Sequence, residues 1–255
     1  MIGKPIFELD RIDSTNAYAN KVLATGDLTE GTVIWAHEQY AGRGQQYHLW
    51  ISEAGKNLTF TVVLKPLFLP PDRQFLLNKA VSLGVLDFVR SSIKNISGNQ
   101  IPETGIKWPN DIYVGNQKIG GILIEHKIMG NILDTSLAGI GMNINQIRFS
   151  SEIPNPVSLI HLLHSEMALK EALMEICSCL GNRYKMLQDE ETETLDHDYH
   201  NSLLGYNQWR NFTRNGILME GKITGVDNLG RLLIEIRSGE VVTFNHREVE
   251  YVLGD

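Results

Sequence analysis

Residues 105–126 read GIKWPNDIYVGNQKIGGILIEH, and this stretch decides which fold the chain can adopt. Residues 111–114 and 118–126 are rich in apolar and β-branched side chains, which favours strands, and Gly115-Asn116 between them is typical of a turn. The Gly120-Gly121 pair inside the second strand costs stability, and such glycines commonly mark a bulge or a place where a ligand or another backbone comes close. The stretch therefore predicts a rigid hairpin with room beside it for a ligand.

The residues on either side of the hairpin predict a sheet with flanking helices. Apolar spacing and turn residues indicate strands at 6–9, 32–37, 57–64, 106–108 and 132–144, and helices at 13–23, 73–93 and 168–188. Because short turns join the central strands into a meander, we expect a mixed but mainly antiparallel sheet. The acidic run at 189–198 is expected to be a solvated face or a linker.

The composition changes again near Tyr206. Short strands are expected at 209–213, 216–226, 231–236 and 240–244, and their regular spacing with turns between them is typical of a small β-barrel. We therefore predict an α+β protein with a large domain at 1–205 and a small C-terminal barrel domain at 206–255.

The composition is that of a soluble globular protein. Of 255 residues, 42% are apolar and 21% charged, and no apolar run approaches the roughly 20 residues that cross a bilayer. The first residues lack the layout of a signal peptide, and Cys177 and Cys179 lie two apart in a helical pattern that aims them at different faces. A disulfide framework is therefore not expected, and the predicted location is the reducing cytoplasm, without membrane contact.

The loop after the predicted strand at 32–37 contains Gly42-Arg43-Gly44, a pattern suited to anions. The glycines can expose their amides and adopt positive φ, and the arginine presents a planar fork that fits phosphate or carboxylate. Alone the pattern is weak, because most Gly-x-Gly loops are ordinary turns. It is not a Walker loop, since no Gly-Lys-Ser or Gly-Lys-Thr follows.

Lys107 lies just ahead of the hairpin, where Trp108-Pro109 stiffens the backbone. A lysine held there can act as a fixed positive charge, although a single lysine at a strand end is most often a surface residue. Gly139 and Gly141 repeat the glycine pattern on the next strand, so two adjacent strands open space at similar heights. This combination favours a slot for a small molecule.

Three classes of function are disfavoured. The formal net charge of −7 repels a polyanion unless a local basic patch overrides it, which argues against nucleic acid. The histidine-bearing stretches at 161–164 and 196–200 lack a recognised metal-ligand spacing and are expected on solvated faces. Neither Gly-x-Ser-x-Gly nor His-Glu-x-x-His is present, which leaves a hydrolase without a nucleophile or a metal.

A series of blocks in one order, spanning nearly the whole chain, resembles the biotin protein ligases. The blocks are Asp13-Ser14-Thr15-Asn16, Gln39 through Trp50, Lys107-Trp108-Pro109-Asn110-Asp111, Gly120-Gly121-Ile122-Leu123-Ile124-Glu125 and Gly139-Ile140-Gly141-Met142-Asn143. The resemblance implies a class II synthetase-like catalytic domain followed by a small Src-homology-3-like β-barrel. It also implies the biotin–[acetyl-CoA-carboxylase] ligase activity. In that reaction the biotin carboxylate attacks the α-phosphate of ATP with Mg²⁺, and a lysine of a biotin carboxyl carrier protein then attacks the biotinyl-adenylate.

The resemblance also assigns roles to residues. The implied catalytic residues are Lys107, which would bridge carboxylate and phosphate, Arg43 as a second cation, and Asp111, which would orient the lysine, metal or nucleophile. The implied biotin contacts are Ser14, Thr15, Asn16, Gln39, Gly42, Arg43, Lys107, Gly120, Gly121, Ile122 and Gly139. The implied ATP or adenylate contacts are Arg43, Gly44, Gln45, Trp50, Lys107, Asn110, Asn143 and Arg247. Trp50 fits a buried core position nearly as well, and no fixed protein site for a metal is expected, because Mg²⁺ would arrive with ATP.

Two features depart from the pattern of many members. The glycine loop continues as Gln45-Gln46-Tyr47-His48, where many members have more basic residues and another glycine, so we expect faster escape of the adenylate. The catalytic pattern starts close to Met1, which leaves no room for the helix-turn-helix of repressor-type members, so we expect no DNA binding by this chain.

Two alternatives remain open. A lipoate or octanoate protein ligase or transferase shares the catalytic architecture, although residues 107–111 and the C-terminal barrel favour biotin. The other is a non-catalytic sensor of biotin or nucleotide, although Arg43 and Lys107 are both present. The sequence leaves open whether the protein is a monomer or a homodimer.

Overall fold

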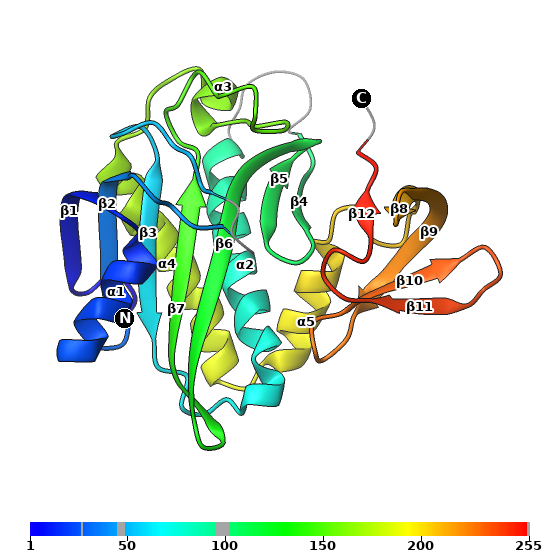
Figure 1. The fold of residues 1–255 in the computed structure, drawn as a ribbon, viewed down its shortest axis with the longest axis horizontal. Coiled ribbons are helices and arrows are strands. Elements are labelled where there is room, and N and C mark those ends of the chain that lie inside the picture. Colours follow the sequence, from blue (N-terminus) through cyan, green and yellow to red (C-terminus); the bar gives the residue numbers. More distant parts are fainter. Residues whose placement is uncertain (27, 45–48, 95–101, 254–255) are drawn as a thin grey trace.

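Two β-sheets organise the molecule. The computed structural model describes residues 1–26, 28–44, 49–94 and 102–253. The larger sheet has seven strands in the order β1-β2-β3-β7-β6-β5-β4, and the smaller has five in the order β11-β10-β9-β8-β12. Figure 1 shows the smaller sheet beside the β4 end of the larger one, with α5 between them.

The elements of the larger sheet come first in the chain, and the smaller sheet follows. The larger sheet consists of β1 (Ile6–Ile12), β2 (Val33–Gln39), β3 (Leu58–Leu64), β4 (Thr104–Lys107), β5 (Asp111–Val114), β6 (Gln117–Met129) and β7 (Ile132–Met142). The helices are α1 (Thr15–Thr25), α2 (Phe75–Ile93), α3 (Leu159–Leu163), α4 (Leu169–Gln188) and α5 (Thr192–Asn201), with a 3-10 turn at Pro71–Arg73. The smaller sheet consists of β8 (Trp209–Arg214), β9 (Ile217–Val226), β10 (Leu232–Ile236), β11 (Val241–Phe244) and β12 (Glu250–Tyr251). Within the described residues, no helix is long and apolar enough to span a membrane.

The larger sheet is mixed, as predicted. β1 pairs in parallel with β2, and each of the other neighbouring pairs in this sheet is antiparallel. The predicted hairpin is present, with Gly115 at its turn in a left-handed conformation (φ 56°) that a side chain rarely adopts. The register between β5 and β6 shifts next to Gly120, so the glycine pair marks a bulge.

The two faces of the larger sheet are covered differently. α2 and α4 pack on one face, where Phe60 and Val62 of β3 join the main hydrophobic core. α1 packs on the other face, where Val63 joins a smaller apolar cluster with Ala19 of the helix. Alternate residues of β3 thus serve two cores, and α1 covers only part of its face (Figure 1).

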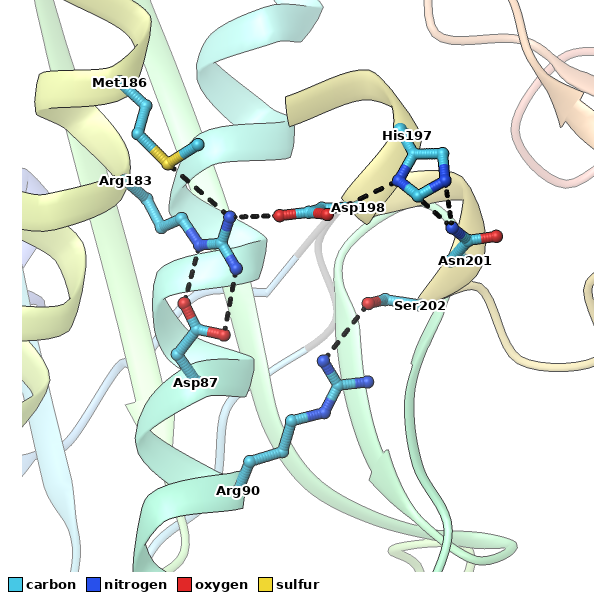
Figure 2. A network of polar contacts seen from close by, with 8 residues as sticks. All are labelled: Asp87, Arg90, Arg183, Met186, His197, Asp198, Asn201 and Ser202. Atoms are coloured by element: carbon cyan, nitrogen blue, oxygen red, sulfur yellow. Dashed lines mark hydrogen bonds and ion pairs between the residues drawn. The ribbon is translucent and has the colours of Figure 1, made fainter. Parts of the chain in front are cut away.

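Residues 189–198 are not a linker, because residues 192–198 belong to α5. The alternative prediction, a solvated face, is confirmed for most of the run, in which Leu195 is the one buried residue. Figure 2 shows Arg183 of α4 between Asp87 of α2 and Asp198 of α5, with an N–O distance of 2.6 Å to each carboxylate. Asp198 is thus paired with α4, and Asp196 is paired with Lys79 of α2. Local composition does not reveal such pairings.

The segment after α5 runs along the edge of the larger sheet. The amide of Ile106 in β4 donates to the carbonyl of Ser202 (2.7 Å), and the amide of Leu204 donates to the carbonyl of Ile106 (2.9 Å). This pairing covers the edge strand that leads into Lys107, and it brings the chain to the smaller sheet.

Candidate functional site

A cavity of about 310 Å³ opens on the α1 face of the larger sheet. Its wall combines the start of α1, the loop after β2, the ends of strands β4 to β7 and the segment around β12. Most residues singled out from the sequence line it, namely Ser14, Thr15, Asn16, Gln39, Arg43, Gly44, Trp50, Lys107, Asn110, Asp111, Gly121, Ile122, Gly139 and Arg247. Segments from opposite ends of the chain therefore meet at one site.

The register of the strands explains why the charged residues lie next to the glycines. Lys107 pairs with Asp111 across β4 and β5. Asp111 pairs with Gly121, and Gly121 pairs with Gly141 on β7. Because directly opposite residues share a face of an antiparallel sheet, this row places an ammonium and a carboxylate beside two positions without side chains.

The glycines make room for side chains that border the cavity. A Cβ on Gly139 would lie 2.6 Å from Asn16 Oδ1, and a Cβ on Gly141 would run into the indole ring of Trp50. A Cβ on Gly121 would lie 3.3 Å from a carboxylate oxygen of Asp111. The glycines therefore leave space beside these strands, as predicted. Protein side chains occupy part of that space, and the cavity occupies the rest.

Three of the residues singled out from the sequence do not line the cavity, and one is not described. A Cβ on Gly120 would meet the sulfur of Met142, on the far side of the strand from the cavity. Gly42 accepts the backbone amide of Trp50 (2.9 Å), and Asn143 donates to the carbonyl of Val157 (3.0 Å). Gln45 lies outside the described residues, as do residues 46–48, so the expected faster escape of the adenylate stays a prediction.

Lys107 is held between two aromatic rings. Its Nζ lies 5.5 Å from the ring centre of Tyr113 and 5.6 Å from that of Tyr251. Burial lowers the pKa of Lys107 below its ordinary value, and Lys118 adds to this effect while Asp111 opposes it. Aromatic faces attract a cation, so the rings fix the ammonium where burial alone would disfavour the charged form.

Lys118 is a site residue that the sequence analysis missed. Its Nζ lies 2.7 Å from Asp111 Oδ1 and 5.9 Å from the ring centre of Trp50. The available signal was its place in the opening stretch, where the β5–β6 hairpin carries it back toward Asp111. Asp111 therefore has a cation on either side.

The C-terminal segment contributes side chains that no local pattern indicated. His246, Glu250 and Tyr251 line the cavity together with Arg247. They reach it because β12 pairs with β8 and returns the chain to the larger sheet. Two residues are too few to show a strand period, so β12 and its side chains escaped prediction.

A second group of lining residues is polar and uncharged. Ser14, Thr15 and Asn16 lie at the start of α1 and are almost fully buried. Gln39 Oε1 accepts hydrogen bonds from the backbone amide of Thr15 (2.7 Å) and from its hydroxyl (3.1 Å). This group suits a neutral polar part of a ligand, whereas Arg43 and Lys107, 64 positions apart, supply positive charge to the same cavity.

The chain is similar in sequence and in fold to proteins of one family. The model of the Biotin/lipoate A/B protein ligase family matches residues 8–143. The bifunctional ligase/repressor BirA of Bacillus subtilis (strain 168) is 30% identical over 244 residues, which cover 94% of this chain and 72% of that protein. The biotin–[acetyl-CoA-carboxylase] ligase of Paracoccus denitrificans is 34% identical over 140 residues, which cover 53% of each chain. The solved biotin protein ligase from Aquifex aeolicus in complex with biotin and ATP has the same fold, with a TM-score of 0.79 and 23% identity over 98% of this chain and 100% of that one.

Proposed function

The chain belongs to the biotin/lipoate A/B protein ligase family, and we propose that it is a biotin–[acetyl-CoA-carboxylase] ligase. It activates biotin with ATP as biotinyl-5′-AMP and transfers the biotinyl group to a lysine of a biotin carboxyl carrier protein. One observation carries this proposal: two cations, Lys107 and Arg43, line a single cavity with the neutral polar group of Ser14, Thr15 and Asn16.

In the first step, a carboxylate oxygen of biotin attacks the α-phosphorus of ATP, and the bond to pyrophosphate breaks. Both reactants are negatively charged, so their approach is opposed unless fixed cations lie between them. Lys107, held between its aromatic rings at the cavity, would lie between the two groups, and Arg43 would provide a second positive charge. Holding the two reactants in attack geometry can itself contribute about 7–11 kcal/mol.

In the second step, the amine of the carrier lysine attacks the carbonyl carbon of the adenylate, and AMP leaves. The incoming lysine has to lose a proton before it can act as a nucleophile. Asp111 and Glu250 are the carboxylates that border the cavity, and Asp111 is already paired with Lys118. We assign Asp111 the role of orienting the cations around it.

We propose that the Mg²⁺ needed for the reaction is bound together with ATP. Among the described residues, no group of three or more His, Cys, Asp or Glu side chains could hold a metal ion. Two bordering carboxylates suit an ion that is held mainly by phosphate oxygens and water, as Mg²⁺ commonly is. Mg²⁺ brought in with ATP would neutralise part of the phosphate charge.

The C-terminal residues are part of the proposed catalytic unit. We propose a boundary between a biotin and ATP domain at 1–205 and a small domain at 206–255, since the second sheet begins at Trp209. Arg247 and Tyr251 of the small domain line the cavity, so each domain is incomplete without the other.

The carrier protein is the proposed macromolecular partner. The net charge of −7 does not favour a polyanion, and we propose that this chain makes no functional contact with DNA. A mobility-shift titration at low salt, with duplex DNA of random sequence, tests this; a complex at submicromolar protein would refute it.

The first experiment is exchange of labelled pyrophosphate into ATP, run with biotin, with lipoate and with neither. Biotin-dependent exchange that Lys107→Ala abolishes supports adenylation at this cavity. Lys170→Ala, at an exposed lysine on α4, is the matched control and should exchange like the unaltered protein. Exchange with lipoate alone identifies a lipoate ligase, and biotin binding without exchange identifies a sensor.

A further inference from the structure

A chain of buried polar contacts connects Glu125 to the neutral end of the cavity. Glu125 lies on β6, outside the residues expected to contact biotin, and its Oε2 accepts a hydrogen bond from Asn16 Nδ2 (2.8 Å). On the other side of that amide, Asn16 Oδ1 accepts the hydroxyl of Thr61 (2.6 Å). Thr61 Oγ1 also lies 2.8 Å from Thr15 Oγ1. Four side chains thus form one continuous line of contacts.

The direction of these hydrogen bonds follows from counting protons. An ionised carboxylate only accepts, so the amide atom that faces Glu125 has to be the nitrogen of Asn16. The amide oxygen therefore faces Thr61, and it too only accepts. A hydroxyl has one proton, and Thr61 gives it to Asn16, which leaves lone pairs on Thr61 Oγ1 toward Thr15.

Counting protons in the same way also determines what Thr15 and Gln39 offer to a ligand in the cavity. The hydroxyl of Thr15 has one proton, which can go to Gln39 Oε1 or to Thr61. Because Thr61 has given its own proton to Asn16, the 2.8 Å contact between the two hydroxyls is a hydrogen bond only if Thr15 is the donor, and both lone pairs of Thr15 Oγ1 then stay free to accept from a ligand. Gln39 Oε1 is held by the backbone amide of Thr15, so Gln39 offers its amide nitrogen as a donor. A cyclic urea, with N–H donors beside a carbonyl acceptor, is complementary to an acceptor at Thr15 and a donor at Gln39.

Burial and packing give the chain little freedom to rearrange. Asn16 and Thr61 are 3% and 0% exposed, so water cannot replace a misdirected hydrogen bond at either residue. Gly139 leaves the space that Asn16 Oδ1 occupies, since a Cβ there would lie 2.6 Å away. A flipped Asn16 amide would turn its oxygen toward two acceptors, the carboxylate of Glu125 and the backbone carbonyl of Leu123, which now lies 3.4 Å from Asn16 Nδ2. The hydroxyl of Thr61 would then have to accept from Asn16 and give its proton to Thr15, which would occupy a lone pair of Thr15.

We propose that Glu125 is a positioning residue, which fixes the amide orientation of Asn16 and through Thr61 sets the wall at Thr15 to accept hydrogen bonds from a cyclic urea. The inference rests on the proposed function, because the cyclic urea is the ring of biotin. It adds a determinant of biotin recognition that does not itself line the cavity.

The test is a reciprocal exchange of carboxylate and amide, measured as biotin KM and kcat in pyrophosphate exchange. Glu125→Gln removes the charged acceptor and leaves the Asn16 amide oriented only by the longer contact with the Leu123 carbonyl (3.4 Å), so we expect biotin KM to rise about tenfold with kcat and the KM for ATP little changed. Asn16→Asp puts two carboxylates face to face and should raise biotin KM by about 100-fold or more. In the double variant, the new amide at position 125 has to donate to the new carboxylate at position 16, which still accepts from Thr61, so KM should return to within about threefold of the original value.

Recovery in the double variant is the result that a merely structural role would not give. A double variant as impaired as the product of the two single variants overturns the proposal. Thr61→Val, which breaks the line without touching the carboxylate, covers the case in which Glu125→Gln does not fold. It should raise biotin KM by a similar factor, and an unchanged KM also overturns the proposal. An unaltered protein that shows no exchange with biotin overturns the proposed function as well, whereas normal exchange with an unchanged KM in Glu125→Gln overturns only this inference.

Discussion

The charge on Lys107 has to persist in a place where burial works against it. Burial lowers its pKa, and a lysine is charged below its pKa and neutral above it. If the charge is needed between carboxylate and phosphate, the exchange rate should fall as pH rises through this lowered pKa, earlier than an ordinary lysine with a pKa near 10.4 would dictate.

Lys107→Arg separates this effect from other alkaline losses. Arginine stays charged at every pH of the assay, so the alkaline fall should disappear while the rate at neutral pH drops about tenfold, because the planar fork replaces a point charge. The measurement is biotin-dependent exchange from about pH 7 to about pH 10. An alkaline fall at the same pH in both proteins would assign it to another group.

Replacing Gly141 tests whether the glycines keep space open at the cavity or are needed only for the strand to form. Gly141→Ala would push against the ring of Trp50, which lines the cavity, so we expect the KM for ATP or biotin to rise about tenfold. Gly181→Ala is the matched control, because a Cβ there meets nothing within 4 Å. Gly181 lies inside α4, so its replacement should raise the free energy of unfolding by about 0.5–1 kcal/mol and leave both KM values alone.

One part of the cavity lining follows from local sequence. Lys107, Asp111 and Gly121 lie on three consecutive strands joined by short turns, so their proximity follows from strand pairing that local sequence encodes. Tyr251 and Glu125 were not predicted as site residues, because their contacts join segments more than 100 positions apart. Side chains brought together by tertiary packing were thus either missed or identified only through the family resemblance.

At the scale of elements, α5 is held by charge as much as by burial. Arg183 lies between Asp87 and Asp198, and these two hydrogen-bonding carboxylates raise its pKa although burial lowers it. In Figure 2, Arg90 of α2 makes a separate contact, with the hydroxyl of Ser202, which follows α5. The helices α2, α4 and α5 therefore share one ionic junction.

Arg183→Met should leave two carboxylates facing each other across the junction. We expect the free energy of unfolding to fall by about 1–2 kcal/mol, because removing the arginine leaves two carboxylates uncompensated, while their partial exposure to solvent keeps the loss below that of a fully buried pair. Urea unfolding at neutral pH measures this loss. Lys185→Met, which removes the partner of Asp189 in an exposed pair at the end of α4, is the control and should show no measurable loss. Equal losses in the two variants would mean that the junction stabilises the fold no more than an exposed ion pair does.

Element prediction succeeded where hydrophobic period and length agreed. α2 and α4 were expected within two residues of their observed ends, and β5 was expected with its observed bounds. The run at 189–198 was predicted only in part: most of it is exposed as expected, but its sequence indicated neither the helix nor the pairing of Asp196 and Asp198 with cations of α2 and α4. A prediction from hydrophobic periodicity cannot identify charged partners that lie on other helices.

At the scale of the whole molecule, the turn between β4 and β5 is fastened from two directions. Trp108 Nε1 donates to the carbonyl of Gly230 in the smaller sheet (2.9 Å). The hydroxyl of Tyr199 on α5 donates to the carbonyl of Pro109 (3.1 Å), and burial raises the pKa of Tyr199 well above its ordinary value, so it stays a donor. The turn that separates Lys107 from Asp111 is therefore held by both the smaller sheet and a helix.

This arrangement makes the smaller sheet a part of the catalytic geometry, and it can be tested by deleting these two hydrogen bonds one at a time. Trp108→Phe and Tyr199→Phe each delete one of the two hydrogen bonds and keep an aromatic ring in place. Each should lower the free energy of unfolding by about 1 kcal/mol and reduce kcat for exchange about tenfold, because a turn free to shift misplaces Lys107. Trp209→Phe, at a 36% exposed position in the same small sheet, should change neither quantity. If the first two variants lose stability but keep kcat, the smaller sheet only supports the fold, and its side chains at the cavity act independently of the turn.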